Sequence, residues 1–215
     1  MSKRKSTGII AFILFLLLQT VMLAGCGSEK DLDPVTNLKI DKNGRVTSTI
    51  VEDFDREFYT LEGLKDMIEA ELASYDDSAN PAITLQGGEL TESEDKVLIT
   101  LFYASCKDYE AFNDVELFFG TVAQAQAAGY DFNVKLIDAG GKGEDIGREE
   151  LLAMPDSWVL IVRQSAQVSQ ITLPTKVLYF SEGTQLLNRN SVSLPGGTDA
   201  QDITWKGELT YIVIK

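Results

Sequence analysis

The sequence predicts an α+β fold, in which an N-terminal hairpin and amphipathic helices pack on a mainly antiparallel sheet and the C-terminal part is rich in β-strands. Three observations predict it. Apolar residues recur at helical spacing between residues 60 and 75, a β-branched run covers residues 96–103, and short strand-like runs follow residue 157. Helices that precede a series of short strands with Gly and Pro between them are typical of this class.

The first expected element is a β-hairpin. Two runs, residues 38–41 and 46–51, flank the dipeptide Asn43-Gly44. Both turn residues tolerate positive φ, so the dipeptide predicts a tight turn between two antiparallel strands.

The strongest helix prediction covers residues 61–75. Thr60 can cap its first turn, and a run of acids, Asn80 and Pro81 ends it. The residues at three- and four-residue spacing that form its apolar stripe are Leu61, Leu64, Ile68, Leu72 and Tyr75.

The rest of the chain alternates strands and short helices. Residues 96–103 predict a strand in the interior of a sheet, because nearly all are apolar or β-branched. We expect helices over 107–113, 122–128 (capped by Thr121 and closed by Gly129) and 146–154 (stopped by Pro155), and strands over 132–137, 158–162, 166–173, 176–180, 191–194 and 208–214. No linker-like stretch divides them, so residues 35–215 are expected to form one domain.

The N-terminal segment is typical of an export signal. A basic stretch, Lys3 to Lys5, precedes ten apolar residues from Ile9 to Leu18. The segment ends in Leu23, Ala24, Gly25 and Cys26, which resembles the lipobox of bacterial lipoproteins, in which the Cys thiol takes a diacylglyceryl group before cleavage. The resemblance implies a signal peptide over residues 1–25, lipid attachment at Cys26 and a tether over residues 26–34.

Two other interpretations of the N-terminal segment stay open. The stretch from Gly8 to Gly25 approaches the ~20 apolar residues of a spanning helix, so an uncleaved anchor is one of them. A plainly secreted protein is the other. If two acyl chains are attached, they suffice for stable anchoring. The expected location is then the outer face of the cytoplasmic membrane.

Charge argues against one class of partner. The chain has 33 acidic and 19 basic residues, and loss of residues 1–25 would change its net charge from −14 to −17. Such acidity disfavours nucleic acid, whose binding depends on Lys and Arg. With Cys26 lipidated, Cys106 has no partner in the chain, and its apolar neighbours favour burial.

The absence of histidine excludes the most chemistry. Ser-His-Asp and Cys-His triads and His-ligated metal sites cannot form. Ser93-x-x-Lys96 lacks the supporting motifs of penicillin-binding proteins, and Gly140 to Gly143 lacks the frame of a phosphate loop and is expected to be a flexible connection. Tyr179 to Gly183 lacks the first glycine of a nucleophile elbow and is expected to be a strand end and turn. We therefore expect no catalytic residues, no cofactor and no metal.

An acidic cluster is the one candidate for ion binding or hydrolysis. In extended backbone Asp53, Asp55 and Glu57 would share one side, and Glu52 would point to the other. These carboxylates could bind calcium or serve acid-base hydrolysis. The simpler interpretation, which we favour, is a solvated acidic face opposite Phe54 and Phe58.

The aromatic residues could build a face that stacks on sugars, although aromatics among aliphatic residues are more often core. Trp205, after a Gly-rich loop, is the one we single out. The others considered are Trp158, Tyr103, Tyr109, Phe112, Phe118 and Phe119.

The mature chain is similar to uncharacterised lipoproteins of anaerobic Gram-positive bacteria. The resembling stretches are residues 50–54, 108–113, 119–125 and 211–215. The resemblance implies a Gram-positive envelope and transfers no activity. The expectation is a non-enzymatic module that binds an envelope protein or a wall component. The alternatives are a carboxylate-dependent wall glycan hydrolase and a small-ligand or ion carrier beside a transporter.

Overall fold

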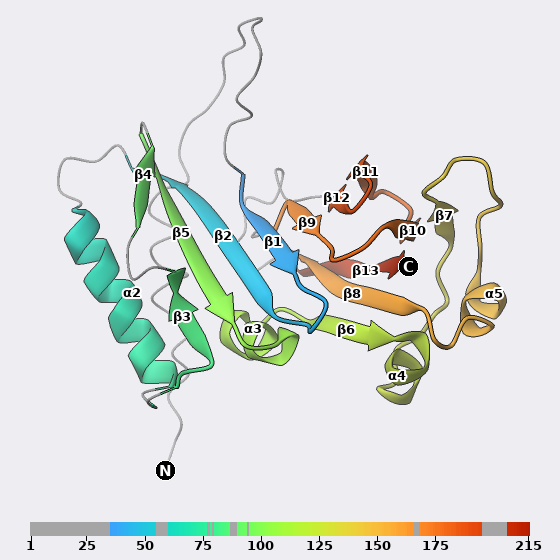
Figure 1. The fold of residues 1–215 in the computed structure, drawn as a ribbon, viewed down its shortest axis with the longest axis horizontal. Helices are drawn as coiled ribbons and strands as arrows, with labels where there is room; N and C mark the ends of the chain where they lie inside the picture. The colour runs from blue at the N-terminus through green and yellow to red at the C-terminus, as the bar shows by residue number, and fades with distance from the viewer. Residues whose placement is uncertain are drawn as a thin grey trace, which may run out of the picture.

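The fold is α+β and rich in β-structure (Figure 1). The computed structural model describes residues 35–54, 60–76, 78, 80–86, 90–93, 95–165, 168–194 and 206–215. Within them lie an eight-stranded and a five-stranded sheet, called here sheet A and sheet B. Several predictions concern residues outside this description. They are those for the export segment, Cys26, the tether, Asp55, Glu57, Phe58 and Trp205.

Sheet A joins strands from both ends of the chain. Its order is β11-β12-β9-β1-β2-β5-β3, with β4 also paired to β5. The one parallel pair is β1 with β9, so the prediction of mainly antiparallel pairing is confirmed. Its strands are β1 (Asn37–Ile40), β2 (Val46–Asp53), β3 (Ile83–Leu85), β4 (Thr91–Ser93), β5 (Lys96–Tyr103), β9 (Gln170–Thr172), β11 (Gln185–Asn188) and β12 (Ser191–Ser193).

Sheet B is antiparallel throughout, in the order β6-β8-β13-β10-β7. Its strands are β6 (Leu117–Thr121), β7 (Leu136–Asp138), β8 (Trp158–Ser165), β10 (Val177–Ser181) and β13 (Lys206–Ile214). The two long strands β8 and β13 lie side by side in its middle.

Both faces of sheet B are covered. On one face Leu160 and Ile212 pack in a cluster with residues of sheet A such as Leu101. On the other face Ile161 and Val213 pack in a second cluster, which α4 (Val122–Ala127) and α5 (Arg148–Leu152) help to form. Neighbouring residues of one strand therefore face two different cores.

Helices α2 (Leu61–Tyr75) and α3 (Cys106–Asn113) complete the inner side of sheet A. The predicted cap of α2 is confirmed, since Thr60 Oγ1 accepts the N–H of Gly63 at 3.1 Å. The ring of Tyr75, at the end of α2, meets that of Phe112 of α3 edge-on at 5.3 Å.

Of two further predicted helices, one begins at its predicted cap and the other differs from the prediction at both ends. Thr121 caps α4 through a reciprocal capping box with Gln124, as its position predicted. The helix predicted over 146–154 is wrong at both ends, because α5 covers only 148–152. Ile146 instead pairs with Leu136 through two backbone hydrogen bonds of 2.9 Å.

The hairpin prediction is confirmed, but its turn is longer than a two-residue Asn-Gly turn. Ile40 pairs with Val46, and only Gly44 has positive φ, at 78°. The Asp41 side chain organises the loop by accepting the N–H groups of Asn43 and Arg45 at 2.7 and 3.0 Å. A carboxylate that satisfies the loop's amides removes the need for a second left-handed residue.

The strand predicted over 132–137 is mostly wrong, because only 136–138 form β7. Phe132 is buried instead, with its ring 5.9 Å from that of Tyr211, whose hydroxyl donates to the Asp131 carbonyl at 2.5 Å. This packing makes the segment a cover for sheet B rather than a member of it. Strand β9 is likewise shorter than the predicted 166–173, and strands β3, β4, β6 and β11 were not predicted.

Candidate functional site

The candidate site lies on the outer face of sheet A, the face opposite sheet B. Strand register aligns Lys39, Thr47, Phe102 and Thr84 in one row across β1, β2, β5 and β3. The next row aligns Asn37, Thr49 and Thr100, with the two threonine hydroxyls 3.5 Å apart. Because side chains alternate along a strand, the residues of these rows lie on the face opposite the buried residues.

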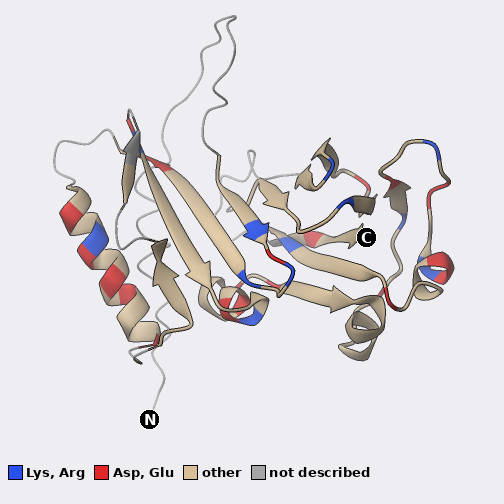
Figure 2. Cartoon of the chain, viewed as in Figure 1, with Lys and Arg blue, Asp and Glu red and all other residues tan. Residues whose placement is uncertain are grey.

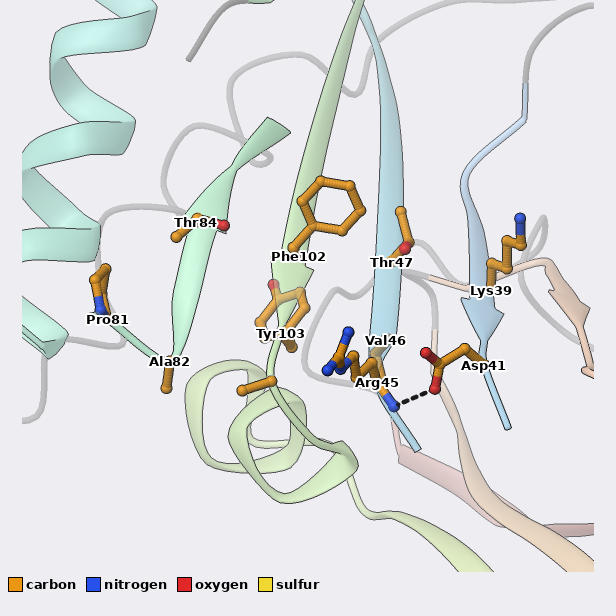
Figure 3. Close-up of a pocket in the computed structure, with 11 residues that line it drawn as sticks. Lys39, Asp41, Arg45, Val46, Thr47, Pro81, Ala82, Thr84, Phe102 and Tyr103 are labelled. Atoms are coloured by element: carbon orange, nitrogen blue, oxygen red, sulfur yellow. Dashed lines mark hydrogen bonds between the residues drawn. The ribbon is translucent and has the colours of Figure 1, made fainter. Parts of the chain in front are cut away.

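Phe102 is the one aromatic in these rows. Its side chain is 41 % exposed, whereas its neighbours Leu101 and Tyr103 are 2 % and 1 % exposed and point into the core. Figure 3 shows the ring standing between Thr47 and Thr84. These small flanking side chains leave the ring open to solvent.

Beside the ring is a shallow hollow of about 480 Å³. Its polar lining includes Lys39, Asp41, Arg45, Thr47 and Thr84 (Figure 3). It holds two cations and one carboxylate, and that carboxylate is already engaged by two backbone amides of the turn. No ion pair between described residues involves Lys39 or Arg45. The hollow is thus a locally basic spot on a chain of net charge −14.

Of the acidic cluster the structure describes Glu52 and Asp53, and these two lie on opposite sides, as predicted. Glu52 and Asp53 are consecutive in β2, so their side chains leave on opposite faces. Glu52 is half-buried on the inner side, and burial, with a smaller contribution from Asp53, raises the pKa of its carboxyl to about 7. Asp53 instead makes an ion pair with Lys96 at 3.1 Å.

Metal ligation finds no support among the described residues. No group of three or more Cys, Asp or Glu side chains there could hold an ion. Asp55 and Glu57 lie outside those residues, so the complete cluster stays a prediction.

Cys106 is buried, as its apolar neighbours predicted, with 7 % of its surface exposed. Its thiol donates to the Gly44 carbonyl at 3.5 Å. Burial is the main cause that raises its pKa to about 12, which leaves the thiol protonated and a weak nucleophile at neutral pH.

The loop Gly140 to Gly143 is not an open phosphate loop, and the flexible connection expected there is instead tied down. Asp138 Oδ2 accepts the N–H groups of Gly143 and Lys142 at 2.8 and 3.0 Å, and these bonds hold the pKa of Asp138 below its usual range. The amides that might cradle an anion are therefore filled by the chain's own carboxylate. Asp138 was not among the residues singled out from the sequence.

Two other dismissed motifs are structural. Ser93 and Lys96 are paired residues of the β4–β5 hairpin, and the Lys96 amine contacts Asp53. Residues 179–183 form the end of β10 and a turn in which Gly183 has φ of 85°, as predicted.

The predicted aromatic candidates are mostly core. Tyr103 and Tyr109 are buried, with their rings 5.1 Å apart. Trp158 is 38 % exposed, but its ring lies 4.9 Å from that of Phe119. The sequence analysis did not single out Phe102. A usable signal was its spacing: Phe102 lies two residues after the polar Thr100, so in a strand both side chains point to the same face.

Comparison with known proteins gives no relative: no family model, curated protein or solved structure matches the chain. Among the described residues, none of the helices has both the length and the apolar character needed to cross a membrane.

Proposed function

We propose that this chain is a lipid-anchored extracytoplasmic lipoprotein whose domain is a non-enzymatic binding module for a glycan of the cell wall. The observation that carries the ligand proposal is the exposed ring of Phe102 between hydroxyl-bearing residues of sheet A. The proposed location at the membrane rests on the lipobox at residues 23–26. The proposed partners are thus the membrane, through Cys26, and the wall.

The chemistry of the outer face suits a sugar chain. An aromatic ring offers a flat apolar surface for the C–H face of a pyranose, and adjacent hydroxyl and amide groups can exchange hydrogen bonds with sugar hydroxyls. The rows around Phe102 supply Thr47, Thr49, Thr84 and Thr100. Lys39 and Arg45 at one end would meet a carboxylate of the glycan.

The first test measures glycan binding by the full chain in neutral detergent, with purified wall glycan strands as the probe and calorimetry as the readout. Phe102→Ala is expected to weaken binding at least tenfold, because truncation of a central aromatic anchor costs about 1.4 kcal/mol or more. Met67→Ala is the matched control, since Met67 is 42 % exposed on α2, away from this face. Equal binding by both variants would refute the site.

The second test concerns the anchor. Cys26→Ser is expected to abolish incorporation of labelled fatty acid and to change the fractionation of the protein. Cys106→Ser, at the second cysteine, is expected to leave labelling intact. Labelling that survives Cys26→Ser would overturn the lipoprotein assignment.

A glycan hydrolase that uses Asp53, Asp55 and Glu57 is the competing proposal. The ion pair of Asp53 with Lys96 argues against it, because this carboxylate already has a cationic partner. Digestion of the same glycan strands decides between them: a hydrolase releases fragments and loses turnover in Asp53→Asn/Asp55→Asn. A binding module releases none.

A further inference from the structure

A second hollow, distant in sequence from Phe102, gathers positive charge. It measures about 610 Å³ and is lined by Pro174, Thr175, Lys176, Arg189, Asn190 and Lys215, which we call the basic hollow. Figure 2 shows basic ribbon segments beside the C-terminus of the chain, near β10 and the β11–β12 hairpin. Its lining holds three cationic side chains and no acidic one.

The three cations lack acidic partners in the described part of the chain. Lys176, Arg189 and Lys215 are exposed, and none of the ion pairs between described residues includes them. Even if the last residue contributes its terminal carboxylate, the hollow keeps a net charge of about +2 on a chain of −14. Lys176 is also the smallest of the effects that lower the pKa of Asp138, whose carboxylate is bound chiefly by the Gly143 and Lys142 amides.

The backbone segments that carry the three cations are joined by hydrogen bonds. Three segments meet there through backbone hydrogen bonds: Lys215 N–H to the Lys176 carbonyl at 3.0 Å, Val177 N–H to Arg189 at 3.0 Å, and Leu173 N–H to Asn190 at 2.8 Å. The Thr175 hydroxyl adds a bond of 2.9 Å to Lys215 O, and the Asn190 amide donates to Leu173 O at 2.8 Å. The charges therefore converge from a fixed frame rather than from one flexible loop.

We propose that the basic hollow binds a phosphate-bearing polyanion, with Arg189 and the two lysines as its ligands. A guanidinium offers a planar fork that matches two phosphate oxygens, and ammonium groups add point charge. The N–H groups of Asn190 and Lys215 already donate within the chain. Recognition therefore depends chiefly on the cationic side chains and is sensitive to salt. One phosphodiester carries a single negative charge and would neutralise only one of the three cations, which favours phosphate groups in series.

The source of the phosphates could be an envelope polymer or a lipid headgroup. Both carry phosphodiesters, and the two differ in the number of adjacent charges. The polymer is the proposal, because three cations suit several phosphates at once. This inference is independent of the glycan proposal, since none of the hollow's residues lies in the rows around Phe102.

The test is calorimetric titration of the full chain in neutral detergent with tripolyphosphate, and separately with glycerophosphoglycerol as a single headgroup. We expect saturable binding of tripolyphosphate, at least tenfold tighter than that of glycerophosphoglycerol and weakened by added sodium chloride. Equal affinity for the two probes would overturn the polymer and leave a headgroup site.

Charge variants locate the site. Lys176→Glu and Arg189→Ala are expected to weaken tripolyphosphate binding at least tenfold. Lys42→Glu makes the same charge change as Lys176→Glu at an exposed turn residue and should alter binding less than twofold. Absence of saturable binding, or an equal loss in Lys42→Glu, would overturn the proposal. Arg189→Ala, which introduces no acid, guards against a loss caused by misfolding in Lys176→Glu.

Discussion

Sheets A and B differ in how many of their faces are covered. Sheet B, covered on both, contributes to stability, and sheet A, open on one face, can also carry a binding surface. In the middle of sheet B, Val159, Leu160, Ile161 and Val162 are all fully buried. In sheet A, β5 alternates between buried Leu101 and exposed Phe102. A sheet buried on both faces has no surface left for a ligand, whereas a sheet with one open face can carry one.

The largest expected effect tests whether sheet B is covered on both faces. Leu160→Ala and Ile161→Ala remove neighbouring side chains that face opposite cores. Each is expected to lower the free energy of unfolding by about 2–5 kcal/mol, because each leaves a cavity in packed surroundings. Urea denaturation measures both. A loss below about 1 kcal/mol in Ile161→Ala alone would mean that α4 and α5 do not seal their face.

The next effect concerns the inner side of sheet A, where Glu52 is half-buried. Its carboxyl has an ordinary pKa of 4.5 and a folded-state pKa of about 7, so the folded protein keeps a proton that the unfolded chain releases. This contribution to stability is complete below pH 4.5 and is lost as the pH rises through about 7.

Glu52→Gln is therefore expected to match the wild type near pH 4 and to be more stable at pH 8. The difference at pH 8 is on the order of 3 kcal/mol, from a shift of this size. Thermal melts of both proteins across this range supply the measurement. A difference that does not change with pH would show that the carboxyl is solvated and that the inner side is open there.

A smaller effect is expected where β8 leaves the core. Arg163 donates to Glu116 Oε2 through Nε and Nη2 at 3.1 and 2.6 Å, and through Nη1 to the Gly207 carbonyl at 3.1 Å. Arg163→Ala is expected to cost about 1–3 kcal/mol, since it leaves half-buried acceptors without donors. Lys65→Ala, which breaks an exposed pair with Glu69 at 3.7 Å, is the control and should cost about 0.5 kcal/mol or less. Urea denaturation compares the two, and equal costs would contradict a clamp across β6, β8 and β13.

Local signals explain which parts of this fold could be predicted. Thr60 and Thr121 cap their helices through contacts three residues away, and β5 is apolar along most of its length. The failures have long-range causes. Phe132 lies outside any strand and packs its ring against that of Tyr211, which is 79 positions further along the chain.

The candidate sites divide in the same way. The open side of Phe102 was readable from the alternation of β5, once that strand is taken to have one solvated face. The basic hollow could not be predicted, because Lys176, Arg189 and Lys215 come from three segments. Only the pairing of β10 with β13 and the backbone bond between Val177 and Arg189 bring these segments together. The role of Asp138 could not be predicted either, because a single acid before a Gly-rich loop does not indicate which backbone amides it will bind.

The smallest expected effect on stability comes from a substitution on the outer face of sheet A. This substitution distinguishes a role in folding from a role in ligand binding. Thr100→Val keeps the β-branched shape and removes a hydroxyl that lies 3.5 Å from that of Thr49. Stability is expected to change by about 0.5 kcal/mol or less, as for surface positions. Binding of wall glycan strands is expected to weaken several-fold, because a hydrogen-bonding group beside Phe102 is lost. Urea denaturation and calorimetry on the same variant measure the two effects. A large loss of stability with unchanged binding would mean that this face is packed against another part of the protein and is not a ligand surface.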